Sequence, residues 1–152
     1  MAKEFNLDSD KDWILFISSF TFKKGDTEYR LSRYNNNLED GRYLQSWDIK
    51  SKEILISWIK KFIARPTDKE FIYRPHPSED YDYELSKLSD DFDNFHYIKK
   101  YAIQEWLRPC EFLNTIISTS IVDVYLRETQ CNILRPAALK QEFDNPLFDG
   151  AT

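Results

Sequence analysis

One of the two histidines of the chain lies in a segment with prolines on both sides, Arg74-Pro75-His76-Pro77. The segment ends an apolar stretch, residues 70–74, that predicts a short buried strand. Imidazole and guanidinium groups at a strand end are charge-assisted donors that suit a phosphate group. A histidine between prolines also fits a rigid structural turn, so both interpretations stay open at this point.

Three consecutive hydroxyl residues, Ser118, Thr119 and Ser120, follow a second predicted strand over residues 112–117. A helix is expected directly after them, over residues 120–127. The start of a helix offers free backbone N–H groups and the positive end of the helix dipole, which favour an anion. Serine and threonine before a helix more often serve only as caps, and that alternative stays open.

Other predicted strands also end in polar groups. The apolar run 12–20 carries Ser18 and Ser19 near its carboxyl end, and Arg135 follows the short strand 131–134. Carboxyl ends of parallel strands meet at one edge of a sheet, and open α/β sheets bind ligands there, near the point where strand order reverses. The residues predicted to form a phosphate site are Ser18, Ser19, Arg74, His76, Ser118, Thr119 and Ser120.

Predicted strands alternate with predicted helices along the chain. The expected order is strand 12–20, a short helix plus loop 27–41, helix 46–64, strand 70–74, helix 80–92, strand 95–98, helix 102–107, strand 112–117, helix 120–127 and strand 131–134. This alternation predicts an α/β fold, a Rossmann-like open, doubly wound parallel sheet of about five strands with helices on both faces. We expect a flexible start (1–11), one domain (12–136) and a tail (137–152) that packs on the domain or leaves it.

Composition narrows the functional classes. The chain of 152 residues is 41% hydrophobic, which favours one domain with a proper core, and its net charge of -5 argues against a nucleic-acid-binding protein. Neither glycine-rich nucleotide fingerprint occurs, and no zinc-ligand cluster is present, so no metal is expected. Cys110 and Cys131 are isolated, which favours reduced thiols over a disulfide and indicates a cytoplasmic location.

The spacing of two motifs resembles a known group of enzymes. Tyr73-Arg74-Pro75-His76-Pro77, followed by Ile117-Ser118-Thr119-Ser120, is similar to the "HP" and "SS" motifs of GT-B-fold bacterial surface-carbohydrate glycosyltransferases. These include capsule and lipopolysaccharide transferases and the CMP-sugar-using sialyl- and Kdo-transferases. The resemblance covers roughly residues 12–148 and is to the carboxyl-terminal, nucleotide-sugar-binding half of those enzymes.

The resemblance implies roles for individual residues. His76 would be the catalytic residue, donating to the phosphate of the donor nucleotide, and residues 118–120 would hold the same phosphate. This chain has Ser-Thr-Ser where the motif has adjacent serines, which leaves open which hydroxyls act. Glu105 and Asp123 compete for the contact with the ribose, although each also fits a plain surface position. The base would lie against Tyr97 and Ile98.

The resemblance also implies a function and partners. The chain would be the donor-binding domain of a glycosyltransferase in surface-polysaccharide biosynthesis, with a CMP- or CDP-linked sugar as substrate and no cofactor. Enzymes of this fold have two such domains, so we expect an amino-terminal acceptor domain or a partner subunit to complete the site. The resemblance also implies peripheral association of the full enzyme with the inner face of the membrane.

Two alternatives remain open. One is a polyol-phosphate transferase domain of the CDP-glycerol type, which uses a similar fold. The other is a non-catalytic interaction domain that kept the fold and lost the ligand. In that case, exposed aromatic residues such as Tyr29, Tyr34 and Tyr81 would serve a partner surface.

Overall fold

The structure is a computed structural model, and it describes residues 1–107, 109–110, 112–116, 121–126, 128 and 130–144. Its centre is one sheet of five parallel strands in the order β3-β2-β1-β4-β5. The strands are β1 (Asp12–Ile17), β2 (Lys69–Arg74), β3 (Phe95–Tyr97), β4 (Phe112–Thr115) and β5 (Gln130–Ile133). The strand order reverses between β1 and β4. This arrangement confirms the predicted Rossmann-like, doubly wound α/β fold.

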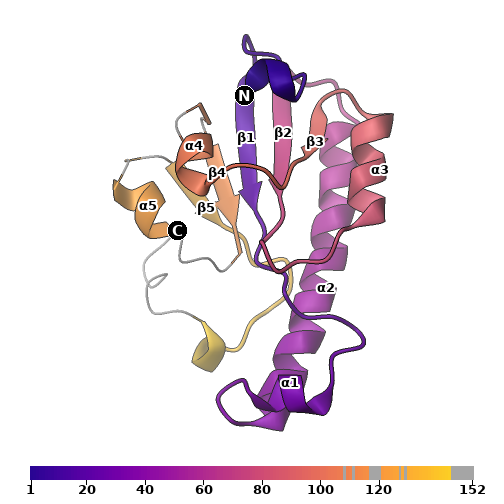
Figure 1. The fold of residues 1–152 in the computed structure, drawn as a ribbon, viewed down its shortest axis with the longest axis vertical. Helices are drawn as coiled ribbons and strands as arrows, with labels where there is room; N and C mark the ends of the chain where they lie inside the picture. Colours follow the sequence, from indigo (N-terminus) through magenta and orange to yellow (C-terminus); the bar gives the residue numbers. More distant parts are fainter. Residues whose placement is uncertain (108, 111, 117–120, 127, 129, 145–152) are drawn as a thin grey trace.

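The helices lie on both faces of the sheet, as Figure 1 shows. They are α1 (Glu28–Ser32), α2 (Leu38–Ile63), α3 (Tyr83–Asp91), α4 (Ile103–Leu107) and α5 (Ile121–Leu126), with 3₁₀ turns at Ala2–Glu4 and Gln141–Phe143. Helices α2 and α3 cover one face, and α4 and α5 cover the other. None of the described helices combines the length and the apolar character that crossing a bilayer requires.

Helix α2 begins well before residue 46, where the sequence pattern placed its start. The side chain of Asn37 caps it by accepting hydrogen bonds from the backbone N–H groups of Glu39 and Asp40. Gly41 is needed in the first turns because a Cβ there would lie 2.1 Å from the backbone oxygen of Leu31. The polar first turns and the glycine, a poor helix former, hid this part of the helix from the periodicity.

Two other elements, β1 and α3, are shorter than predicted, for local reasons. Strand β1 ends at Ile17, and the Oγ atom of Ser18 accepts a hydrogen bond from the backbone N–H of Phe20, which turns the chain out of the sheet. Helix α3 begins at Tyr83 because the Asp82 side chain caps it. The remaining predicted strands and helices lie within about two residues of their observed positions, which is the usual scatter of element ends.

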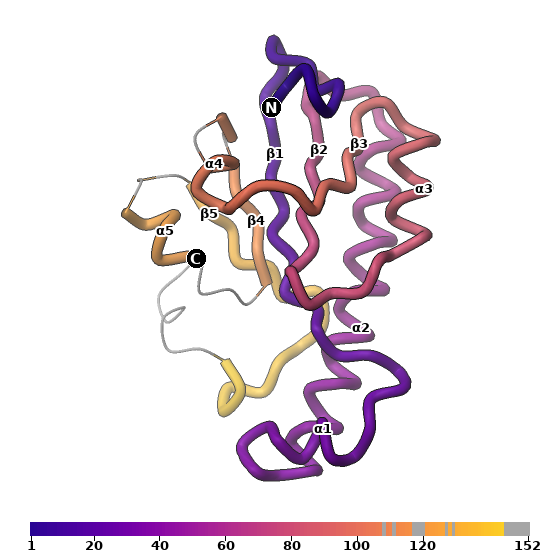
Figure 2. Tube along the Cα trace, viewed as in Figure 1, coloured from indigo at the N-terminus to yellow at the C-terminus, as the bar shows by residue number. Residues whose placement is uncertain are grey.

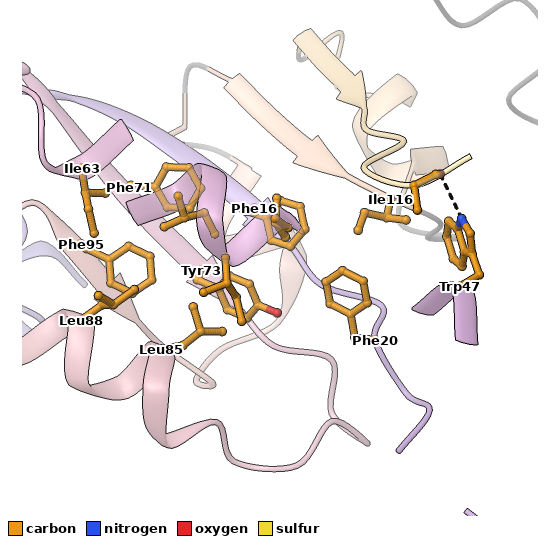
Figure 3. Close-up of a cluster of buried hydrophobic side chains, with 14 residues drawn as sticks. Phe16, Phe20, Trp47, Ile63, Phe71, Tyr73, Leu85, Leu88, Phe95 and Ile116 are labelled. Atoms are coloured by element: carbon orange, nitrogen blue, oxygen red, sulfur yellow. Dashed lines mark hydrogen bonds between the residues drawn. The ribbon is translucent and has the colours of Figure 1, made fainter. Parts of the chain in front are cut away.

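Two apolar clusters hold the layers together. Along β1 the side chains alternate: Phe16 packs with α2 and α3, whereas Leu15 and Ile17 pack on the opposite side. Figure 3 shows the first cluster, in which rings from adjacent strands meet. Phe71 and Phe95 stack at 5.8 Å between ring centroids. These buried rings pack the sheet against α2, where Phe71 also contacts Phe62.

Beyond the carboxyl edge of the sheet, the first half of α2, the short α1 and the segment 135–144 lie together (Figures 1 and 2). The indole Nε1 of Trp47 donates to the backbone oxygen of Ala137 at 3.0 Å, drawn as a dashed line in Figure 3. The rings of Tyr43 and Phe143 stack at 4.8 Å. The segment that follows β5 is therefore fastened to α2 next to the strand ends.

Candidate functional site

The strand order places β1, β2 and β4 side by side, and the segments that the sequence singled out follow these strands in the chain. Strand β1 pairs in parallel with both β2 and β4, so the carboxyl ends of these three strands lie at the same edge of the sheet. The backbone N–H of Ser18 donates to the backbone oxygen of Arg74 at 2.9 Å. Ser118, Thr119 and Ser120 lie outside the described residues, so their part in the site stays a prediction.

A buried glutamate, Glu79, ties the end of β1 to the end of β2. The residue is 5% exposed, and its side chain accepts four hydrogen bonds. The Oε2 atom accepts from Ser18 Oγ at 2.5 Å and from the backbone N–H of His76 at 3.2 Å. The Oε1 atom accepts from Tyr73 Oη at 3.0 Å and from Lys52 Nζ at 2.8 Å. We call Glu79 and these donors the Glu79 network.

Charge compensation makes this buried network stable. Lys52 also reaches Asp82 Oδ2 at 2.8 Å, so one ammonium group serves two carboxylates. Burial acts to lower the pKa of Lys52, but Glu79 and Asp82 outweigh it and hold that pKa above its ordinary value. Burial, followed by the charge of Glu79, raises the pKa of Tyr73 well above its ordinary value, so the phenol stays a hydrogen-bond donor.

The side chains of His76 and Arg74 bond to backbone groups and not to Glu79. His76 is half-buried, and its Nδ1 accepts a hydrogen bond from the backbone N–H of Ser78 at 3.1 Å, which leaves Nε2 as the ring's donor. Arg74 donates from Nη2 to the backbone oxygen of Tyr101 at 2.7 Å, while its Nε is buried without a hydrogen-bond partner in the described structure. Burial lowers the pKa of Arg74.

The two residues predicted to contact a base lie on opposite faces of the sheet. The ring of Tyr97 stacks on Tyr73 at 5.7 Å, and its hydroxyl accepts from the backbone N–H of Asp82 at 3.3 Å, next to the Glu79 network. Ile98 extends the sheet through its backbone N–H, which donates to the Tyr73 oxygen at 3.0 Å. Its side chain is buried in the second apolar cluster. Tyr97 therefore borders the site, and Ile98 supports it from behind.

The two candidate ribose contacts belong to α4 and α5. Glu105 is exposed, and its Oε2 accepts from the backbone N–H of Ala102 at 3.2 Å, a local bond at the start of α4. Asp123 lies half-buried in the first turn of α5. Both helices cover the face of the sheet opposite α2, and no hydrogen bond between described residues joins either carboxylate to the Glu79 network. Their role in ribose binding stays a prediction.

A cavity of about 510 Å³ opens beside the strand ends. It is formed by the loop after β1, the turn between α1 and α2, the inner face of α2 and the segment after β5. Its lining residues are Ser19, Thr21, Phe22, Tyr34, Asn35, Leu44, Trp47, Asp48, Glu142, Phe143 and Asp144. We call it the Asp48 cavity. It lies where a doubly wound sheet binds its ligands, and its volume is that of a small-molecule site.

Asp48 is the most unusual group in this cavity. Its side chain is 5% exposed, and its Oδ2 accepts from the backbone N–H groups of Thr21 and Phe22 at 3.1 and 3.0 Å. No Lys or Arg side chain bonds to it within the described part of the chain. Burial raises the pKa of Asp48 to about 6, against the two backbone hydrogen bonds, which lower it. A carboxyl group so perturbed in a cavity is typical of functional sites.

No protein-family model, curated protein or solved structure matches this chain. The functional argument therefore rests on the fold and on the geometry of the site. The described residues contain no group of three or more His, Cys, Asp or Glu side chains that could hold a metal ion.

Sequence reasoning missed the central residues of the site. Glu79 stands three residues after His76, but its burial depends on the way the loop folds back onto β1. Asp48 and Lys52 are spaced four apart on α2, on the same side as the core residue Leu55. A carboxylate in the apolar stripe of an amphipathic helix was a readable signal, because such a position is normally apolar.

Proposed function

We propose that this chain is the nucleotide-sugar-binding domain of a glycosyltransferase in surface-polysaccharide biosynthesis. The observation that carries the proposal is the position of β1 between β2 and β4. That order brings Ser18 and Ser19 beside Arg74 and His76 at the edge where doubly wound sheets bind phosphates and nucleotides. The two motifs of the sequence resemblance follow the two strands that flank β1.

The proposed chemistry is electrostatic. The donor phosphate would accept hydrogen bonds from His76 Nε2, from the hydroxyl group of Ser19 and from residues 118–120 after β4. Donors fixed before the reaction stabilise the charge that develops on the leaving nucleotide. The Glu79 network supports this role because Glu79 holds the backbone N–H of His76 and the side chain of Ser18 together. Glu79 is thus a positioning residue in this proposal.

The acceptor side of the reaction belongs to another domain or subunit in this proposal. The chain by itself would bind the donor nucleotide and transfer nothing. The candidate donors are CMP- and CDP-linked sugars, with the nucleotide as substrate and no metal in the phosphate site.

Titration of CMP, CDP, UDP and GDP by calorimetry and by NMR tests the proposal. We expect one nucleotide to bind, and His76→Ala to weaken its binding about tenfold, the effect of one charge-assisted hydrogen bond. His96, the other histidine, lies away from the site in a pair with Glu70, so its imidazole signals are an internal control that should not move. Tighter binding of CDP-glycerol than of CDP would indicate a polyol-phosphate transferase instead.

Two results would contradict the proposal. The first is the absence of binding by all four nucleotides, which would favour an interaction domain. The second is binding that His76→Ala leaves unchanged while the fold, checked by circular dichroism, stays intact.

A further inference from the structure

The Asp48 cavity has a chemistry that the phosphate site lacks. We propose that it is the nucleoside subsite of the bound nucleotide, in which Asp48 accepts hydrogen bonds from the ribose hydroxyls and aromatic rings contact the base. The inference rests on the proposed function and names residues that the motifs of the sequence did not indicate. It replaces neither Ser19 nor His76, which would hold the phosphate.

Charge decides which part of a nucleotide could enter the cavity. No Lys or Arg is among its described lining residues, whereas Asp48, Glu142 and Asp144 all line it. Arg135 neutralises Asp144 through a bond from Nη2 to Oδ1 at 2.5 Å, and Lys140 lies 3.7 Å from Glu142. Asp48 is therefore the one lining carboxylate with no ion pair among the described residues, because Lys52, whose charge also acts on it, is bound to Glu79 and Asp82. Such a cavity repels a phosphate and suits an uncharged group that carries hydrogen-bond donors.

Asp48 has an oxygen available for such a donor. Both of its described hydrogen bonds, from Thr21 and Phe22, reach Oδ2, and no bond between described residues uses Oδ1. The side chain is 5% exposed and still lines the cavity. Oδ1 is therefore open to the cavity, where it can accept a hydrogen bond from a hydroxyl group of a ligand. A pair of neighbouring ribose hydroxyls is the matching donor on a nucleotide.

The rest of the lining suits a planar base. Four aromatic side chains, Phe22, Tyr34, Trp47 and Phe143, come from four different segments. Tyr34 keeps 38% of its surface exposed, and its ring lies 6.5 Å from that of Phe22, so two rings border the same part of the cavity. Stacking between a base and an aromatic ring is favourable for every base because each has a π face. Asn35 belongs to the same lining, and its amide side chain carries both donors and an acceptor that suit a base edge.

Ser19 connects the two parts of the proposed site. It follows β1 in the chain, directly after Ser18, which belongs to the Glu79 network. Ser19 also lines the Asp48 cavity. A nucleotide whose phosphate lies at Ser19 would therefore extend its nucleoside into the cavity without a gap.

The test compares cytidine, uridine, adenosine and guanosine with their 2′,3′-dideoxy counterparts by NMR titration of the whole chain at pH 8, where Asp48 is ionised. We expect one ribonucleoside to shift the amide signals of Thr21 and Phe22 and the indole signal of Trp47. Loss of both ribose hydroxyls should raise the dissociation constant at least about tenfold. Asp48→Asn should weaken binding of the ribonucleoside to a similar degree. Glu39→Gln, which changes the charge of α2 by the same amount away from the cavity, should have no effect.

The outcomes separate this inference from the proposed function. Nucleotide binding that depends on His76, with equal affinity for ribo- and dideoxy forms and no effect of Asp48→Asn, would overturn the inference alone. Nucleoside binding that depends on Asp48 but gains nothing from a phosphate would support the inference and overturn the proposed phosphate site. No binding by any nucleoside or nucleotide would overturn both.

Discussion

Two buried carboxylates stand at the carboxyl edge of the sheet, and their surroundings differ. Glu79 and Asp48 are each 5% exposed. Glu79 accepts from two hydroxyls, a backbone N–H and the ammonium of Lys52, so both of its oxygens are in use. Asp48 accepts from two backbone N–H groups at one oxygen and bonds to no cation among the described residues.

The difference separates a structural role from a binding role. A buried charge that is paired and fully hydrogen-bonded holds neighbouring segments in register, and removing it leaves its partner uncompensated. A buried charge without a cation lowers the stability of the fold, and such groups occur where a ligand uses them. The comparison predicts opposite effects for replacing the two side chains.

The largest effect is expected for Glu79→Ala. The change leaves the buried Lys52 with Asp82 alone and leaves Tyr73 and Ser18 without an acceptor, so the free energy of unfolding should fall by about 3 kcal/mol or more. Denaturant unfolding measures it. Glu84→Ala is the matched control, because it removes a glutamate from the exposed pair with Lys60 and should cost less than about 0.5 kcal/mol. Equal losses in the two variants would contradict a structural role for the Glu79 network.

Asp48→Asn should raise the free energy of unfolding, in contrast to Glu79→Ala. The folded state raises the pKa of Asp48 from 3.8 to about 6, so between these values it binds more protons than the unfolded chain. Stability therefore falls as pH rises from about 4 to about 6 and stays lower above that range. The asparagine removes this charge while keeping an oxygen for the N–H groups of Thr21 and Phe22.

The measurement for Asp48→Asn is thermal or denaturant unfolding at pH 4 and at pH 8. At pH 8 the variant should be more stable than the natural chain by roughly 1–3 kcal/mol, and at pH 4 the difference should largely vanish. A variant that is less stable at pH 8 would show that Asp48 is compensated, and the contrast with Glu79 would disappear.

The smallest effect is expected for Tyr73→Phe. This change removes one donor to Glu79 Oε1 and keeps the ring that stacks on Phe16 at 5.2 Å, so a loss of about 1 kcal/mol is expected. Tyr29→Phe, at a site that is 74% exposed, should change stability by less than the error of the measurement. A loss of 3 kcal/mol or more for Tyr73→Phe, of the order expected for Glu79→Ala, would mean that the hydroxyl and not the ion pair dominates the network.

Much of the fold was predictable because it depends on local patterns. The apolar run over residues 12–20 and the stretch before Pro75 identify β1 and β2 by their continuous apolar character, which is typical of strands buried on both faces. The start of α2 was not predictable in this way, because Asn37, Gly41 and the polar first turn carry no apolar periodicity. That part of the helix is stabilised by capping and by close packing against α1, which depend on the neighbouring element.

The sequence by itself determined that hydroxyl, guanidinium and imidazole groups follow strands of a parallel sheet, because alternation and chain order fix which residues come last in a strand. Only the tertiary structure decided that Glu79 bonds to Ser18 and Tyr73 at the ends of β1 and β2, and that Asp48 faces a cavity whose described lining contains no Lys or Arg. Both facts depend on contacts between Glu79 and Ser18 and between Asp48 and the loop after β1, which are far apart along the chain. Burial and charge pairing are properties of those contacts, and a linear pattern does not contain them.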